Sequence, residues 1–310
     1  MKQGRIIQST GSWYKVWVEP GGDTEILDAR LPGKFRLNNH QRTNPGAAGD
    51  RVRLRMNEDG TATIDDILER ENALLRQTNR SNQDAQIIAS NINLAIAVQA
   101  ARQPRPKPGF IDRFLVTCEA YEITPLIVIN KMDLARKKDK EKLDRIRRIY
   151  STLGYELLFT SIEDSKSVES LKDHLKKVTS VMVGHSGVGK TSLLNEIEPG
   201  LERRVGAVST STEKGKHTTT YAQLIPLHHL GGWLIDTPGI REFGLLNIEP
   251  DELWLFFFFF IIIGNDCNFH YCTHIHEPGC PVKEALEEGK IFPERFESYI
   301  QILESLEKQS

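Results

Sequence analysis

The stretch Gly184-His185-Ser186-Gly187-Val188-Gly189-Lys190-Thr191 decides the fold of the middle of this chain. It matches the pattern G-x-x-x-x-G-K-[ST], a glycine-rich loop between a strand and a helix whose backbone N–H groups wrap phosphate oxygens. The apolar run 181–183 before it predicts the strand, and the run 191–195 after it predicts the start of the helix. A phosphate-binding loop in an α/β domain is therefore expected, with the Lys190 ammonium against the β- and γ-phosphates of a nucleotide.

A second motif, Asn130-Lys131-Met132-Asp133, follows a predicted strand and is typical of guanine recognition. The Asp133 carboxylate is expected to accept from N1–H and the 2-amino group of guanine, a pair that adenine does not present. Asn130 is expected to bond the outer edge of the base, and Lys131 to lie over the ring. The short motif Thr160-Ser161-Ile162 is expected to offer a backbone N–H to the guanine O6.

The base-reading motif comes before the phosphate-binding loop, whereas an ordinary GTPase has the opposite order. We infer that the chain is a circularly permuted GTPase. In a parallel sheet the ligand site is built from loops at the carboxyl ends of the strands. Cutting and rejoining such a chain moves the termini but leaves those loops in place, so the permuted order still predicts one shared nucleotide site.

A third motif, Asp236-Thr237-Pro238-Gly239, predicts the magnesium end of the site. The Asp236 carboxylate is expected to reach Mg²⁺ through water, and the Gly239 N–H to sense the γ-phosphate. The Thr191 hydroxyl is expected to bind Mg²⁺ directly. In the loop 215–220, Thr219, or alternatively Thr218, is expected to close over the magnesium only when the γ-phosphate is present.

The residue that positions the attacking water is not the usual one. Many GTPases carry a glutamine directly after this third motif, but here the position is Ile240, which cannot hydrogen-bond water. A slow intrinsic rate is expected, with a partner or another residue completing the site. His217 is the candidate, and a plain surface histidine is the alternative. Lys190, His217 and Thr219 form the predicted catalytic set.

The predicted nucleotide-binding residues combine all of these motifs, and the predicted magnesium ligands are a subset of them. The nucleotide set is Asn130, Lys131, Asp133, Ser161, Gly184, His185, Ser186, Gly187, Val188, Gly189, Lys190, Thr191, Ser192, Thr218, Thr219, Asp236 and Gly239, and the magnesium set is Thr191, Thr219 and Asp236. The cofactors expected are GTP or GDP and Mg²⁺.

Three of the four cysteines crowd near the carboxyl end, in the pattern Cys267-x4-Cys272-x-His274-x5-Cys280. Three thiolates and one imidazole are a ligand set of closed structural zinc sites. The amino terminus shows no export signal, which favours a metal over disulfides. One Zn²⁺ is therefore expected, with His270 and His276 as alternative nitrogen ligands.

Composition shifts predict a multidomain chain. Alternating strand-like stretches and turns over 1–70 predict an OB-fold β-barrel that binds RNA, with Trp13, Tyr14, Trp17 and Phe35 as aromatics of its surface or core. A polar linker over 71–85, a circularly permuted α/β P-loop GTPase domain over 86–246 and an α-helical zinc-binding domain over 247–310 follow. The predicted strands are 92–98, 125–129, 155–159, 181–183, 222–227 and 233–235, and the predicted helices are 112–122, 139–153, 168–178, 191–198, 282–288 and 294–307.

The 310 residues carry a net charge of −2, which excludes a uniformly polycationic chain. Any nucleic-acid contact then needs local patches, and the alternative is that such short runs are solvated surface. The longest apolar run, 253–263, is shorter than the roughly 20 residues that cross a membrane. A monomeric cytoplasmic protein without membrane contact is expected. The candidate patches are Arg51, Arg53 and Arg55, and Arg102, Arg105 and Lys107.

These motifs, in this order, resemble the ribosome small subunit-dependent GTPase A family. The resemblance rests on segments 130–133, 184–191, 215–220 and 236–239 and on the cysteine and histidine set, and the barrel extends it over nearly the whole chain. It implies GTP hydrolysis stimulated by the small ribosomal subunit, late in the maturation of that subunit, with rRNA contacts through the barrel and the zinc domain. The apolar run 256–263 departs from the more polar segment of similar proteins and is an interface, a variant or an error in the recorded sequence.

Two other functions compete with this interpretation. Ile240 is compatible with an RNA-binding assembly factor that binds GTP without significant turnover. A P-loop ATPase or small-molecule kinase is the second alternative, and Asp133 argues against it because adenine offers no partner for its carboxylate.

Overall fold

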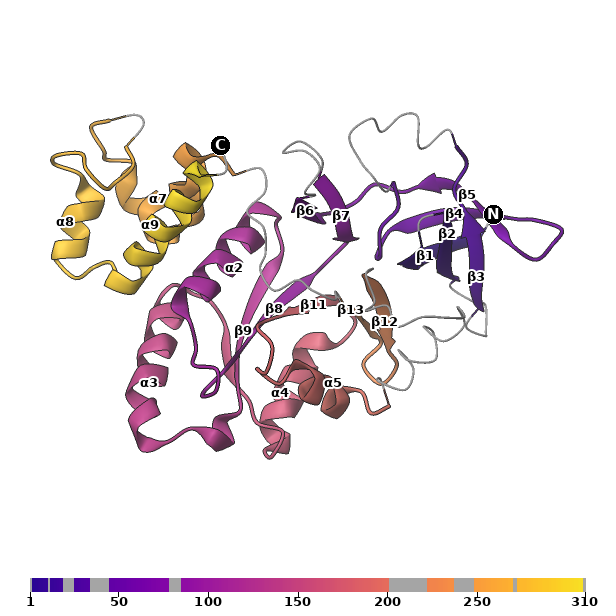
Figure 1. Cartoon of the computed structure of the whole chain (residues 1–310), viewed down its shortest axis with the longest axis horizontal. Coiled ribbons are helices and arrows are strands. Elements are labelled where there is room, and N and C mark those ends of the chain that lie inside the picture. Colours follow the sequence, from indigo (N-terminus) through magenta and orange to yellow (C-terminus); the bar gives the residue numbers. More distant parts are fainter. Residues whose placement is uncertain are drawn as a thin grey trace.

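The computed structural model describes residues 2–10, 12–18, 25–33, 45–77, 85–200, 222–236, 248–269 and 272–308. Figure 1 shows a β-barrel at one end, an α/β domain in the middle and a group of helices at the other end. In the part of the chain that the structure describes, no helix is long and apolar enough to cross a membrane.

The amino-terminal domain is a closed five-stranded barrel. Antiparallel pairs join β1 to β2, β2 to β3, β4 to β5 and β1 to β4, and a parallel pair joins β3 to β5, which closes the circle. Tyr14, Val16 and Val18 alternate into its core, as strand geometry requires. The expected OB-like barrel is confirmed. Its strands are β1 (Lys2–Ser9), β2 (Trp13–Val18), β3 (Glu25–Arg30), β4 (Arg51–Met56) and β5 (Ala62–Ile67).

The central domain is a sheet in the order β10-β9-β8-β11-β13-β12, parallel except for β12. Helices α2 and α3 cover one face and α4 and α5 the other, so each face has its own apolar core. The strands are β8 (Leu94–Ala100), β9 (Thr124–Asn130), β10 (Leu157–Phe159), β11 (Thr179–Val183), β12 (Gln223–Leu227) and β13 (Gly232–Asp236). The helices are α2 (Pro108–Ala120), α3 (Lys137–Thr152), α4 (Ser165–Leu175) and α5 (Lys190–Ile197).

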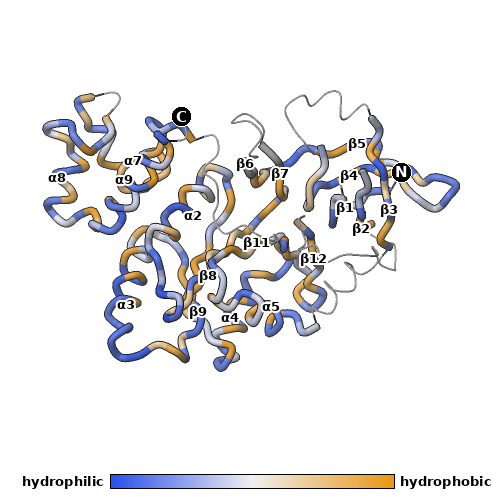
Figure 2. The backbone as a smooth tube through the Cα atoms, in the orientation of Figure 1, coloured by the Kyte–Doolittle hydropathy of each residue, from blue (hydrophilic) through white to orange (hydrophobic). Residues whose placement is uncertain are grey.

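Hydrophobic pattern explains where these elements sit. All seven residues of β8 are buried, as expected for a parallel strand covered on both faces. Helix α3 instead buries one stripe, Leu143, Ile146, Ile149 and Tyr150, and turns a charged face outward. Figure 2 shows this contrast between the hydrophobic β8 and the mostly hydrophilic α3.

The segment expected as a polar linker contains a strand. Strand β6 (Ala73–Gln77) pairs antiparallel with β7 (Ala85–Ser90). Leu74, Ile87 and Ala89 of this hairpin are buried at alternate strand positions, although the polar stretch 76–84 between them is typical of a linker. The domain boundaries themselves remain a prediction.

The barrel continues the sheet of the central domain. Strand β1 pairs with β12 at Gln8 and Gln223, which makes one 11-stranded sheet. Trp17, expected on the surface or in the core of the barrel, instead packs edge-on against Trp233 of β13, with 4.9 Å between ring centroids. The Arg5 guanidinium donates to the Thr179 hydroxyl at 3.0 Å and lies over the Trp233 ring.

A buried carboxylate fastens the same junction. Asp50 is fully buried and accepts two hydrogen bonds from the Arg70 guanidinium, one from the Ser90 hydroxyl and one from the Ala47 N–H. Ala47 lies in the segment before β4, Arg70 follows β5, and Ser90 ends β7. One charge thus ties three separate stretches of chain together.

The carboxyl-terminal helices pack on α2 around a core of their own. Arg295 pairs with the buried Asp112 of α2, and the Tyr150 hydroxyl donates to the same carboxylate at 2.9 Å. The apolar run 256–263 splits between core and surface: Phe257 and Phe260 are buried, whereas Phe258 is 48% exposed and other members of the run are also exposed. The elements are η2 (Pro250–Phe256), α7 (Phe258–Gly264), α8 (Pro281–Glu287) and α9 (Pro293–Glu307).

Replacing Asp50 should destabilise the whole junction. Asp50→Ala leaves the largely buried Arg70 guanidinium without its carboxylate, which typically costs about 3–5 kcal/mol in the free energy of unfolding. Urea unfolding measures this loss. The control is Arg55→Ala, which removes an exposed barrel pair with Asp65 and is expected to matter far less. Equal losses in the two variants would contradict the role given to Asp50.

Candidate nucleotide site and metal centre

The phosphate-binding loop connects β11 to α5 and requires glycine for two reasons. Gly184, Gly187 and Gly189 have φ angles of 151°, 83° and 95°, values that side-chain-bearing residues rarely adopt. A Cβ at Gly184 would lie 2.2 Å from the Val98 carbonyl oxygen, and a Cβ at Gly189 would lie 2.4 Å from the Asn130 amide nitrogen. The loop is therefore pressed against the ends of β8 and β9.

The base-reading motif and the phosphate-binding loop meet directly. The Asn130 amide donates to the Val188 carbonyl oxygen at 3.0 Å, and the Lys131 ammonium donates to the Gly187 carbonyl oxygen at 2.5 Å. Residues more than fifty positions apart in the sequence thus hold each other at one sheet edge. The permuted motif order predicts that the two motifs share one site, and this contact brings them together.

Neighbouring hydroxyls orient the base-reading side chains. The Thr160 hydroxyl donates to the Asn130 side-chain oxygen at 3.1 Å, which leaves the amide nitrogen facing the loop. The Ser161 hydroxyl donates to the exposed Asp133 carboxylate at 2.6 Å. The Ser161 N–H, expected to serve guanine O6, here donates to the Ser167 hydroxyl. The hydroxyl roles of Thr160 and Ser161 were missed because sequence gives no distance between the two loops.

Charge at the phosphate end comes from Lys190 and Asp236. The Lys190 ammonium donates to the Gly184 and His185 carbonyl oxygens. Burial lowers the pKa of Lys190 and raises that of Asp236, while their mutual attraction opposes both shifts. Asp236 ends β13 beside the loop, and Thr191 and Ser192 are exposed in the first turn of α5.

The remaining predicted site residues lie outside the described part of the chain. These are His217, Thr218, Thr219 and Gly239, and Ile240 lies there as well. Their assignment to catalysis, magnesium or the γ-phosphate stays a prediction.

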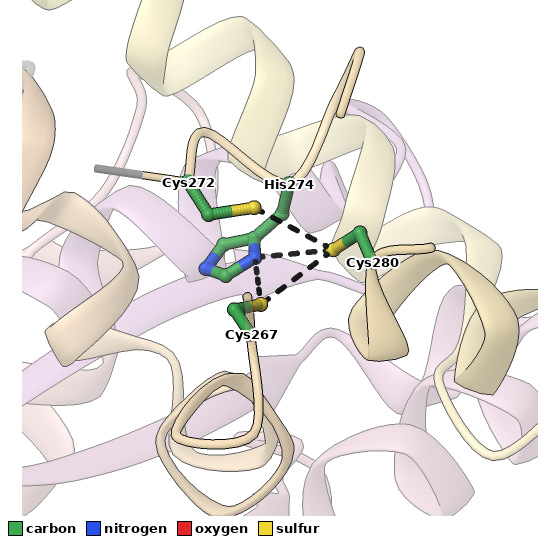
Figure 3. A group of neighbouring side chains, drawn as sticks. All are labelled: Cys267, Cys272, His274 and Cys280. Atoms are coloured by element: carbon green, nitrogen blue, oxygen red, sulfur yellow. Dashed lines mark hydrogen bonds between the residues drawn. The ribbon is translucent and has the colours of Figure 1, made fainter. Parts of the chain in front are cut away.

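The metal centre is assembled as expected. Cys267, Cys272, His274 and Cys280 place one ligand atom each within 4.8 Å of one another, and Figure 3 shows the four side chains converging. Two sulfur–sulfur distances are 3.8 Å, and two distances from sulfur to the His274 Nδ1 are 3.4 Å. A tetrahedron with Zn–S bonds of about 2.3 Å and a Zn–N bond of about 2.0 Å gives sulfur–sulfur edges of about 3.8 Å and sulfur–nitrogen edges of about 3.5 Å, so the cluster fits one zinc ion.

Burial shifts the pKa values of the ligands in this cluster. Burial lowers the pKa of His274, which keeps its imidazole neutral and able to donate a lone pair. Burial raises the pKa of the Cys272 thiol, so the thiolate form needs a positive ion nearby. Of the alternative nitrogen ligands, His276 is exposed and not part of the cluster, and His270 lies outside the described residues.

Glu277, which sequence reasoning did not single out, braces the zinc loop. Its carboxylate accepts from the Thr273 N–H and hydroxyl and from the N–H groups of Ile275 and His276. Burial opposes its ionisation, but the Thr273 and His276 hydrogen bonds together lower the pKa of Glu277 to about 2. An acidic residue between the last two ligands was the only available signal.

Two family models of known proteins match most of this chain. The model of the RsgA GTPase family matches residues 67–246, and that of the RsgA N-terminal domain matches residues 3–64. The chain belongs to the RsgA GTPase family. It is therefore a GTP-hydrolysing enzyme that uses GTP or GDP and Mg²⁺. The expected family resemblance is confirmed.

Relatives of this RsgA family member match over nearly their whole length. The small ribosomal subunit biogenesis GTPase RsgA of Christiangramia forsetii is 39% identical, with 98% of this chain and 96% of that protein covered. RsgA 2 of Bacteroides thetaiotaomicron is 36% identical, with 99% and 97% covered.

Solved structures show the same architecture. YjeQ from Thermotoga maritima aligns with a TM-score of 0.77 at 35% identity, over 98% of each chain. YloQ, a circularly permuted GTPase, aligns with a TM-score of 0.76 at 30% identity, over 99% of this chain and 96% of that one. The multidomain, circularly permuted fold inferred from the sequence is thus confirmed.

Changing Asp133 should alter base preference. Asp133→Asn presents an amide where guanine needs two acceptor lone pairs, so GTP affinity should fall by about 100-fold or more while xanthine nucleotides gain. Equilibrium titration with fluorescent GTP and XTP analogues measures the exchange. Asp144→Asn, at an exposed position of α3, is the control and should leave both affinities unchanged. An unaltered guanine preference in Asp133→Asn would remove the base-reading assignment.

Removing one cluster cysteine should remove the zinc. Cys280→Ala is expected to lose the metal, with about one zinc ion per chain in the wild type, and to unfold at a lower temperature. Elemental analysis and thermal unfolding with and without a chelator measure both effects. Cys118→Ala alters a buried cysteine of α2 outside the cluster and should keep its zinc. Wild-type protein without zinc, or Cys280→Ala with it, would contradict the assignment.

Proposed function

We propose that this enzyme binds the small ribosomal subunit and hydrolyses GTP late in the maturation of that subunit. The observation that carries the proposal is the contact of Asn130 and Lys131 with the phosphate-binding loop, because it builds one nucleotide site from a permuted chain. Relatives that align over at least 96% of their own length bear the name of small ribosomal subunit biogenesis GTPases. The subunit also implies a cytoplasmic place of action.

At the base, each residue has a separate task. Asp133 accepts from the guanine N1–H and 2-amino groups, with its carboxylate steered by the Ser161 hydroxyl. Asn130 and Lys131 bind the base edge and the ring face while fixing the phosphate loop. Asn130 and Lys131 belong to the base-reading motif and also bond to the phosphate-binding loop, so base recognition and phosphate binding depend on one another.

At the phosphates, the loop N–H groups of residues 184–191 and the Lys190 ammonium hold the β- and γ-phosphates. Thr191, Thr219 and Asp236 would hold Mg²⁺, which would supply positive charge against the charge that develops on the transferred phosphoryl group. His217 orients the water that attacks the γ-phosphorus. The bond from the γ-phosphorus to the bridging oxygen breaks, and GDP and phosphate are released.

Contact with rRNA is assigned to the barrel and to the zinc domain, and the chain acts as a monomer. On the barrel, Trp13 lies on the strand face opposite the buried Tyr14 and stacks with Arg30, whose guanidinium carbon is 3.8 Å from the ring centroid. Aromatic and guanidinium planes of this kind are platforms for unpaired bases. The proposal includes the domain boundaries: the barrel over 1–70, the linker over 71–85, the GTPase domain over 86–246 and the zinc domain over 247–310.

A second candidate function is a GTP-binding assembly factor without significant turnover. Ile240 favours it, because an isoleucine after the third motif cannot orient water. The two functions differ in whether the small subunit accelerates hydrolysis.

Steady-state phosphate release with and without purified small subunits tests the proposal. Subunits should raise kcat by at least about tenfold, since partner-supplied groups in GTPases commonly give far more. His217→Ala should lose most of this stimulated rate and keep its GTP affinity. His229→Ala, in the exposed turn between β12 and β13, is the control. Wild-type protein that binds subunits without acceleration would instead establish the assembly factor.

A further inference from the structure

The structure distinguishes the two arginine-rich runs of the sequence. On β4 of the barrel, every arginine of the first run faces a carboxylate. Arg51 lies 2.9 Å from Glu71, Arg53 lies 3.7 Å from Asp66 and Arg55 lies 3.1 Å from Asp65. Local carboxylates therefore neutralise this run, which leaves it little net charge with which to attract a polyanion.

The second run lies in the loop between β8 and α2 and has no such partners. Within the described residues, Arg102, Arg105 and Lys107 form no ion pair, and Arg105 and Lys107 are exposed. The sequence alone made the two runs look equivalent, because the carboxylates that pair with the first run come from β5 and the segment after it, which only the fold brings beside β4.

The start of α3 adds further cations at the same place. Arg136, Lys137 and Lys138 are exposed there, next to Asp139. A hydrogen bond from the Arg136 N–H lowers the pKa of Asp139, and the charges of Arg102, Lys138 and Arg105 lower it further. Cations of both segments therefore lie near one carboxylate. We call this surface the basic rim, made of Arg102, Arg105, Lys107, Arg136, Lys137 and Lys138.

The basic residues at the start of α3 do not stabilise that helix. The amino-terminal end of a helix carries a partial positive charge and favours acidic residues. In the first turn of α3, Asp139 is the one acidic residue, whereas Lys137, Lys138 and Lys140 are basic. A basic first turn works against helix stability, so binding explains it better than folding does.

The basic rim lies beside the nucleotide site. Pro104, within the rim loop, is 3.9 Å from the Cβ position of Gly187, whose carbonyl oxygen accepts from Lys131. Parallel pairing brings the carboxyl ends of β8 and β9 together, and Figure 1 shows them at the lower edge of the central domain, where α3 begins.

We propose that the basic rim binds the phosphodiester backbone of RNA in the small ribosomal subunit, an inference that rests on the proposed function. Folded RNA presents closely spaced negative charges along its backbone. The rim cations form no ion pair among the described residues, so they can release counterions from such a surface and bind it without reading its sequence. The rim gives the GTPase domain its own RNA contact, close to the phosphate-binding loop.

The experiment compares two variants that each lose three positive charges. Arg105→Gln/Lys137→Gln/Lys138→Gln removes half of the rim and spares the nucleotide residues. The matched control is Lys166→Gln/Lys172→Gln/Lys176→Gln, with two lysines on α4 and one directly after it, because α4 covers the opposite face of the sheet. Binding to purified small subunits, with a non-hydrolysable GTP analogue, is measured over a series of salt concentrations.

The rim variant should bind at least about tenfold more weakly at moderate salt, and the slope of log affinity against log salt should become shallower by about two. The control should keep the wild-type slope. Equal slopes in rim variant and control overturn the basic rim and leave the proposed function standing. Wild-type protein that does not bind small subunits overturns both.

Thermal unfolding distinguishes an RNA-binding role of Lys137 and Lys138 from a structural role. Lys137→Gln/Lys138→Gln removes charges that oppose the helix dipole, so its Tm should stay the same or rise while subunit affinity falls. A lower Tm together with unchanged affinity would give these lysines a structural role and overturn the proposal.

Cross-linking identifies the class of partner. A photoreactive amino acid in place of Glu141, exposed on α3 between Lys138 and Lys142, keeps every cation of the rim. Irradiation of the complex with small subunits should attach it to rRNA. Attachment to a ribosomal protein alone would overturn the assignment to RNA and would indicate an acidic protein surface.

Discussion

The contact of Asn130 and Lys131 with the carbonyl groups of the phosphate-binding loop is the interaction on which the nucleotide site depends. It spans more than fifty residues, and both partners sit at the ends of parallel strands. A left-handed Lys131 and the positive φ of Gly189 make the close approach possible. Because the two motifs hold one another, each half of the site is positioned before a nucleotide arrives, which lowers the ordering cost of binding.

Fixed junctions connect this site to the rest of the molecule. On one side the barrel extends the same sheet through β1 and β12, and the buried Asp50 clamps the connection. On the other side, Arg295 and Asp112 lock α9 to α2. In the sequence, β12 follows the predicted switch residues 215–220, and β13 leads into the motif 236–239.

Sequence patterns and tertiary contacts contributed different parts of the description. The parallel strands and their helices were predictable because β8 is apolar throughout and α3 has a regular buried stripe. The hairpin of β6 and β7 was not predicted, since both strands are short and the polar stretch 76–84 separates their apolar residues, whose pairing only the tertiary structure shows. The apolar run 256–263 also has a buried and an exposed side, and the sequence did not show this because it depends on the helical geometry of α7.

The sequence by itself determined the chemistry: a phosphate loop, a guanine reader, a zinc ligand set and their permuted order, because each depends on residue types at fixed local spacing. Only the tertiary structure decided which groups face one another. Ser161 donates to Asp133, and Glu277 accepts from the backbone of the zinc loop. Carboxylates pair with the first basic run, Arg51, Arg53 and Arg55. Arg102 and Arg105 of the second run have no ion-pair partner among the described residues. Such pairings follow from strand register and loop packing, which bring together residues that are distant in sequence and leave no local signature.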